Sequence, residues 1–264
     1  MIPIPQEGLS FSQLFSHSFR LWRVAFSKVW IISLLLALLN VIPFMLFKSG
    51  MGTMHETFFL QRDFAPWFAL IIQFLLSLIL VSVMYHQMLL VDSYHETSLG
   101  GSFKVVLKKF HHILIASLLF AIISFVGFFC LLFPGIFLWV ALYFFLPLLL
   151  ITPENSISCF MESFYLVVPH WWRSAVVVYI PMILFETIWI SLKHASWSIY
   201  FLSPASTLFW NVGIALLILA FLFVVTPWII GLFSMYLMDL LNRHHEETEA
   251  KKILTQSSKA DNLA

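Results

Sequence analysis

The sequence contains few charged residues. Only 10% of its 264 residues are Asp, Glu, Lys or Arg, whereas soluble domains average about 25%. So few charges cannot cover the surface of a water-soluble fold of this length, and lipid must therefore solvate much of the exterior. Because the apolar runs are continuous and do not alternate, they exclude a β-barrel and predict an all-α, polytopic membrane protein.

Cysteine and catalytic motifs are also scarce. The two cysteines, Cys130 and Cys159, predict neither a disulfide nor a zinc site by themselves. The ten histidines contain no His-Glu-x-x-His motif, and there is no Gly-x-Ser-x-Gly elbow or P-loop. We therefore expect no enzymatic activity, no catalytic residues, no metal and no cofactor. The net charge of +1 gives no sign of a nucleic-acid partner.

What the chain does have is six apolar stretches. A helix rises about 1.5 Å per residue and must cross a hydrocarbon core of about 30 Å. The six predicted transmembrane helices cover about residues 29–47, 66–84, 113–133, 136–152, 174–192 and 207–241. Pro134-Gly135 signals a turn between the third and fourth spans, and Thr226-Pro227 predicts a kink in the last.

Lysine and arginine are distributed unequally between the two sides of this arrangement. Eleven of the fourteen lie with the N-terminus, residues 92–112, residues 153–173 and the C-terminal tail. The other side holds Lys48, Arg62 and Lys193. Because positive residues favour the cytoplasmic side, both termini are predicted to be cytoplasmic.

Three amphipathic segments precede the odd-numbered spans. Each has large apolar residues at spacing i, i+4, i+7 and i+11 and a serine just before the second of them. The sets are Phe15, Phe19, Trp22, Phe26; Leu99, Phe103, Val106, Phe110; and Phe160, Phe164, Val167, Trp171, with Ser18, Ser102 and Ser163. The overlay predicts three interfacial in-plane helices in a threefold repeat. The alternative is chance matching in a chain with 17% aromatic residues.

The repeat suggests a domain organisation. A single integral membrane domain covers residues 1–244, with units at about 10–91, 94–152 and 155–241, and residues 245–264 form a polar cytoplasmic tail. Units that begin on the same side would be related by an axis along the membrane normal.

The stretch from Pro134 to Arg173 carries a family pattern. Its residues are Pro134-Gly135-Ile136, Pro147, Pro153-Glu154, Ser163-Phe164-x-Leu166 and Trp171-Trp172-Arg173, and Ser18-Phe19-Arg20-Leu21 matches the usual opening. The chain thereby resembles the membrane-domain family fused to some bacterial glycerophosphodiester phosphodiesterases and the related YciC-like inner-membrane proteins. The resemblance covers most of residues 10–240 and implies six spans in the bacterial inner membrane, without established catalytic residues. Pro169-His170 replaces the family's glycine before the Trp pair.

Glu186 is the most unusual single residue. An ionised carboxylate inside a span costs about 2.5–3.5 kcal/mol. It predicts a cation, proton or substrate contact that faces the bundle interior; alternatively, it is protonated or hydrogen-bonds a neighbouring helix. Gln73 and Asn211 are the candidate membrane-embedded polar partners.

Basic residues near the amphipathic segments are candidates for binding lipid headgroups. Each contributes about 1 kcal/mol near an anionic membrane surface. They are Arg20, Arg23, Lys104, Lys108, Lys109 and Arg173. The alternative is that these charges only hold their segments on the cytoplasmic side.

Two functions are compatible with these features. The first is a non-enzymatic membrane scaffold, or a module that positions lipid or a partner protein. The second is a small transporter or channel-like protein that uses Glu186 in a membrane-embedded path. Membrane lipids are the expected partners, with another membrane protein or a second copy of the chain as further candidates. A polar cavity reaching Glu186 would favour transport, and a dry, fully packed bundle would favour the scaffold.

Overall fold

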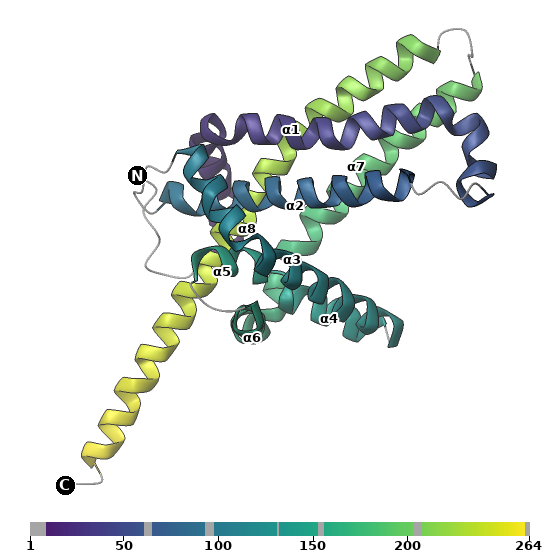
Figure 1. The fold of residues 1–264 in the computed structure, drawn as a ribbon. Helices are drawn as coiled ribbons and strands as arrows, with labels where there is room; N and C mark the ends of the chain where they lie inside the picture. Colours follow the sequence, from purple (N-terminus) through teal and green to yellow (C-terminus); the bar gives the residue numbers. More distant parts are fainter. Residues whose placement is uncertain are drawn as a thin grey trace.

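The computed structural model describes residues 9–60, 65–92, 98–130, 132–152, 156–202 and 207–261, with side chains chiefly at 9–42, 68–90, 98–129, 132–152, 156–192 and 212–246. Every regular element within this part of the chain is a helix (Figure 1). The elements are α1 (Phe11–Leu60), α2 (Ala65–Asp92), α3 (Leu99–Cys130), α4 (Leu132–Leu142), α5 (Phe145–Ile151), α6 (Ser156–Val167), the 3-10 helix η1 (Val168–His170), α7 (Trp171–Leu202) and α8 (Thr207–Asp261).

Six of the described segments are long and apolar enough to cross a membrane. They are Phe11–Ile42, Phe68–Leu90, Leu99–Phe129, Leu132–Ile151, Ser156–Leu192 and Val212–Glu246. Their outward faces carry large apolar side chains, such as Phe125 and Phe129, which are 70% and 83% exposed. Such faces suit lipid, in which a helix satisfies all of its backbone hydrogen bonds internally. The chain is an integral, multi-pass α-helical membrane protein.

The first amphipathic segment and the first span form one helix. Leu14, Leu21, Ala25 and Ile32 are all buried along one face of α1, and this face continues without a change of phase from the amphipathic segment into the span. Helix α1 packs against α8 and α2, with α8 as its more extensive neighbour. The predicted boundary between an in-plane helix and the span is therefore wrong here. Helix α1 also continues past the predicted end of the first span at residue 47, as far as Leu60.

The second amphipathic segment likewise continues into its span, as the N-terminal half of α3. Only the third is a separate helix, α6, which η1 joins to α7. Pro169 lies in η1 and cannot donate the backbone hydrogen bond that would continue α6. Of the three predicted in-plane helices, the structure therefore separates only α6 from its span.

The three serines of the predicted repeat are all buried, but their hydrogen-bond partners differ. Ser18, Ser102 and Ser163 are each 0% exposed. Ser18 Oγ donates to its own helix, whereas Ser163 Oγ donates across to Ala141 O at 2.9 Å. The stripe residue Phe19 is 53% exposed, while Leu14, Ser18 and Leu21 beside it are buried. The threefold repeat stays a prediction.

Helix α8 runs through the centre of the bundle. Its residues from Ile230 to Leu237 are all buried, so this stretch is surrounded by other helices. Pro227 lies inside the same continuous helix. The C-terminal part of the helix projects away from the bundle (Figure 1), and the helix ends at Asp261. The region predicted as a polar tail is thus helical through most of its length.

The Pro134-Gly135 pair lies within α4 and not in a turn between spans. A Cβ added to Gly135 would lie 2.6 Å from Phe128 N and 2.7 Å from Phe128 Cα. Gly127 in α3 faces the same contact, because its added Cβ would lie 3.0 Å from Gly135 Cα. The glycines therefore serve a close approach of the α3 and α4 backbones.

The fourth span is interrupted, as Pro147 makes necessary. Proline has no N–H to donate to the carbonyl four residues earlier, and its ring clashes with that carbonyl. That carbonyl belongs to Tyr143, which lies in the link between the end of α4 at Leu142 and the start of α5 at Phe145. The span consequently consists of two short helices, α4 and α5.

The helices form two groups that diverge (Figure 1). α1 contacts α2 and α8, and α7 contacts α8, whereas α3 and α4 contact each other. In Figure 1, α3 and α4 point away from the first group toward one end of the molecule. The main core lies where the groups meet, and it includes Phe144, Phe233 and Tyr236.

Candidate functional site

A cavity of about 450 Å³ lies where the two groups of helices meet. Its wall comes from α2, α3, α5, α7 and α8, together with the link between α4 and α5. Most of the lining is apolar, for example Phe74 from α2, Phe120 from α3 and Met182 from α7. All five helices belong to the membrane-spanning segments, so the cavity lies at membrane depth.

Few polar groups reach this cavity. Tyr85, Tyr143, Ser117 and Thr226 supply hydroxyl groups, and Glu186 supplies the one carboxylate among the described lining residues. The Ser117 hydroxyl has no hydrogen-bond partner among the described residues. An ion that has lost its water would need several polar protein ligands, whereas an apolar chain needs only van der Waals contacts. The chemistry of the wall favours an apolar ligand.

The predicted membrane-embedded residues are only partly brought together. Glu186 lies on an exposed face of α7 and lines the cavity. Gln73 is half-buried in α2 and is not among the residues that line the cavity. The side chain of Asn211 lies outside the described residues. The structure therefore connects Glu186 with a cavity that Gln73 does not line, and the pairing of Glu186 with Asn211 stays a prediction.

The basic candidates fall into two classes. Arg20, Arg23, Lys104 and Lys108 are exposed. Lys109, in contrast, is half-buried, and its Nζ donates to the carbonyl oxygens of Leu149, Leu150 and Thr152 at 2.8, 3.3 and 2.7 Å. These carbonyls lie at the C-terminal end of α5, where a cation is favoured by the helix dipole. Lys109 thus caps a helix of the interrupted span.

Arg173 is also engaged with protein groups. Its guanidinium lies 3.1 Å from a carboxylate oxygen of Asp239, which Arg243 approaches at the same distance. The other oxygen of Asp239 accepts a hydrogen bond from Leu9 N at 2.8 Å, and both arginines donate to Leu9 O. Asp239 is 4% exposed. The cluster ties the start of the described chain to α7 and α8.

Sequence reasoning overlooked Asp239, although a signal was present. It is a carboxylate within an apolar stretch, four residues before Arg243, which is the spacing of an ion pair on one helix face. Arg173 could not be assigned to it, because 66 residues separate the two.

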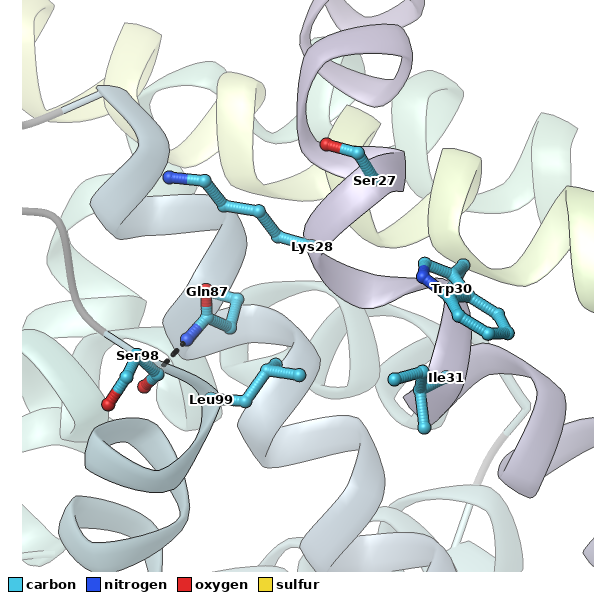
Figure 2. A pocket seen from close by; sticks show the side chains of 7 residues that line it. All are labelled: Ser27, Lys28, Trp30, Ile31, Gln87, Ser98 and Leu99. Carbon is cyan, nitrogen blue, oxygen red and sulfur yellow. Dashed lines mark hydrogen bonds between the residues drawn. The ribbon is translucent and has the colours of Figure 1, made fainter.

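A second pocket, of about 480 Å³, lies between α1 and the junction of α2 with α3. Figure 2 shows Lys28 extending from α1 above Gln87, with Ser98 and Leu99 at the start of α3 opposite. Ser27, Trp30 and Ile31 of α1 complete the lining. Sequence reasoning used Lys28 only to orient the spans.

Gln87 fixes one wall of this pocket. It is 1% exposed, and its Nε2 donates to Ser102 Oγ at 2.5 Å. Nε2 also lies 3.5 Å from Ser98 O, to which it donates a second hydrogen bond (Figure 2). Ser98 Oγ in turn accepts a hydrogen bond from Gly101 N at 3.2 Å, as an N-cap residue does. These contacts hold the positive end of α3 at the pocket.

No family model, curated protein or solved structure matches this chain. Among the described residues, no three His, Cys, Asp or Glu side chains lie close enough together to hold a metal ion. Functional inference therefore rests on the two cavities and on the charges around them.

Proposed function

We propose that the protein is a non-enzymatic module of the bacterial inner membrane that holds the apolar chain of a membrane lipid. The observation that carries this proposal is the apolar cavity of about 450 Å³ between α2, α3, α5, α7 and α8. Ligand pockets commonly measure about 300–1,000 Å³ and are mostly apolar.

The position of the cavity supports a lipid as the occupant. Its wall is made by membrane-spanning helices, and Phe74 and Glu186 at its edge are exposed on the bundle surface. A cavity that opens on this surface is reached first by the acyl chains of the surrounding bilayer. Since the wall offers few hydrogen-bonding groups, it binds by shape and dispersion contacts, which suit a methylene chain.

The test fills the cavity and measures lipid retention. Ala121 lies on α3 at the cavity wall, and Ala121→Phe would occupy part of the space. We expect native mass spectrometry of the detergent-purified protein to show a retained lipid in the wild type and several-fold less in this variant. The matched control is Ala220→Phe, because Ala220 is an equally exposed alanine in the span of α8 that does not line the cavity.

Equal lipid retention by the wild type and the Ala121→Phe variant, with both eluting as folded protein, would contradict the proposal. Equal losses of retained lipid in the Ala121→Phe and Ala220→Phe variants would also contradict the proposal. The lipid would then coat the helices without entering the cavity. A protein subunit or a second copy of the chain that occupies the cavity would appear in the same spectra as added mass of a different size.

A second candidate function is a small transporter, and one observation favours it: Glu186 lines the cavity. A carboxylate beside an apolar wall suits a lipophilic cation or a proton-coupled step. In proteoliposomes under an imposed pH gradient, this candidate predicts uptake of a fluorescent lipophilic amine, which Glu186→Gln abolishes. Uptake equal to that of protein-free liposomes would remove this candidate and leave the lipid-holding function standing.

We further infer that the chain is a relative of the membrane domains fused to glycerophosphodiester phosphodiesterases, with both termini in the cytoplasm. The support is the pattern between Pro134 and Arg173 together with the excess of Lys and Arg on one side. No phosphodiesterase activity follows from that relationship.

A further inference from the structure

The pocket beside Lys28 differs in character from the apolar cavity. The two lie on different sides of α2, because Gln87 lines the first and Tyr85 the second, and residues two apart point about 200° apart on a helix. Ser27, Lys28, Gln87 and Ser98 give this pocket a polar wall, while Trp30, Ile31 and Leu99 give it an apolar one. It is therefore amphipathic.

The electrostatics of the pocket favour an anion. Lys28 is exposed and supplies a full positive charge, and none of the described residues that line the pocket is acidic. The start of α3, fixed there by Gln87 and Ser98, adds the positive end of a 32-residue helix. The amide donor of Gln87 is committed to Ser98 and Ser102, so Gln87 positions the wall and does not bind the ligand.

The aromatic and apolar wall favours an amphiphile over a free ion. Trp30 is 44% exposed, and tryptophan is enriched at membrane–water interfaces at the level of the headgroups. Lys28 lies two residues before it in the same helix. A ligand seated here would have its charge near Lys28 and its apolar part along Trp30 and Ile31.

We propose that this pocket binds the phosphate-bearing headgroup of an anionic phospholipid, with Lys28 as the charged ligand and the start of α3 as the second anion-binding group. Ser98 Oγ lies in the same wall and can donate its proton to a phosphate oxygen, because in the described contacts it accepts from Gly101 N. Ser27 Oγ already donates to Val24 O. The site is independent of the cavity proposed to hold an apolar chain, and each can exist without the other.

The test measures how many short-chain phosphatidylglycerol molecules native mass spectrometry finds on the detergent-purified protein, with short-chain phosphatidylcholine as the neutral probe. Lys28→Ala is expected to lower the apparent affinity for phosphatidylglycerol about fivefold, the factor for one basic residue near an anionic surface. Lys28→Arg is expected to restore it. Lys104→Ala and Lys108→Ala test the competing prediction that the exposed lysines of α3 bind headgroups. Because neither lysine lines the pocket, both variants are expected to lose less affinity than Lys28→Ala.

Three outcomes would overturn the proposal. Equal losses in the Lys28→Ala and Lys104→Ala variants would mean that the lysines attract anionic lipid only through general surface charge. An unchanged affinity in the Lys28→Ala variant would remove the site. Displacement of phosphatidylglycerol by millimolar inorganic phosphate would assign the pocket to a soluble phosphate and not to a lipid headgroup. Unaltered thermal unfolding of each variant establishes that the comparison is between folded proteins.

Discussion

At the scale of single residues, the strongest electrostatic feature is Asp239, whose carboxylate lies between Arg173 and Arg243. Its side chain is 2% exposed, whereas the two arginine side chains are 21% and 23% exposed. The arginines therefore retain some water, but the carboxylate depends on protein donors alone, including Leu9 N. Buried charges of this kind are tolerated only when they are paired and hydrogen-bonded.

Removing Asp239 should therefore be costly. Asp239→Ala leaves two partly buried arginines without their shared carboxylate, and the expected loss of stability is about 3 kcal/mol, the lower end for breaking a buried ion pair. Thermal unfolding in detergent measures it. Glu246→Ala on the same helix removes an exposed carboxylate and should change stability by less than about 0.5 kcal/mol; equal effects of the two substitutions would contradict the assigned role.

Lys109 and Lys108 allow a similar comparison between neighbours. Lys109 Nζ donates to three carbonyl groups at the end of α5, whereas Lys108 is exposed. Lys109→Met should lower the free energy of unfolding by about 1.5–3 kcal/mol, which is what hydrogen bonds from a charged donor contribute. Lys108→Met should leave the free energy of unfolding nearly unchanged. Unfolding curves that shift equally for both variants would show that Lys109 does not hold the interrupted span.

At the scale of elements, the contact between α3 and α4 depends on the absence of side chains. The backbone of Phe128 lies so close to Gly135 that an added Cβ would have to displace it. Gly213 in α8 has nothing within 4 Å of its added Cβ. A side chain added at Gly135 would therefore clash with the neighbouring helix, whereas one added at Gly213 would meet no other atoms.

Substitution by alanine should therefore change the stability of the protein in opposite directions at Gly135 and Gly213. Gly135→Ala should destabilise the protein by about 1–3 kcal/mol, because the helices must separate. Gly213→Ala should stabilise it by about 0.5–1 kcal/mol, because alanine loses less backbone freedom in a helix. Thermal unfolding of the two variants in the same detergent measures these changes in stability. A Gly135→Ala variant as stable as the wild type would disprove the close contact.

The number and order of the spans could be predicted from the sequence, whereas several helix boundaries could not. Long uncharged runs have few alternatives to a spanning helix, so the spans follow from composition. Whether the segment from Phe11 to Phe26 lies in the plane or continues the span depends on what covers its buried face. That neighbour is α8, about 200 residues later, and no local pattern identifies it.

The candidate site shows the same limit. Glu186 stands out in the sequence because carboxylates are rare inside spans, and the structure does place it at a cavity. The cavity itself is formed by five helices distant in sequence, and Lys109 and Arg173 bind groups 40 and 66 residues away. Residue chemistry could be predicted, but the partners required the fold.

At the scale of the whole molecule, six membrane crossings would place both ends of the chain on one side, and the excess of Lys and Arg predicts that this side is the cytoplasm. Single cysteines introduced as Gln6→Cys and Lys251→Cys should react with a membrane-impermeant maleimide only after spheroplasts are lysed. Arg62→Cys should react in intact spheroplasts. The unmodified chain, which contains Cys130 and the buried Cys159, provides the background labelling. Labelling of Gln6→Cys and Lys251→Cys from opposite sides would contradict the six-span topology.

The most direct measurement of the central claim is photo-crosslinking with a phospholipid that carries a photoactivatable group near the end of its acyl chain. The protein is loaded with this lipid, washed in detergent until only tightly held lipid remains, irradiated and digested. The account predicts crosslinks at cavity residues such as Phe120, Tyr143 and Met182. Crosslinks that occur instead on the outward faces, at residues such as Phe125, Phe129 and Leu184, would contradict it.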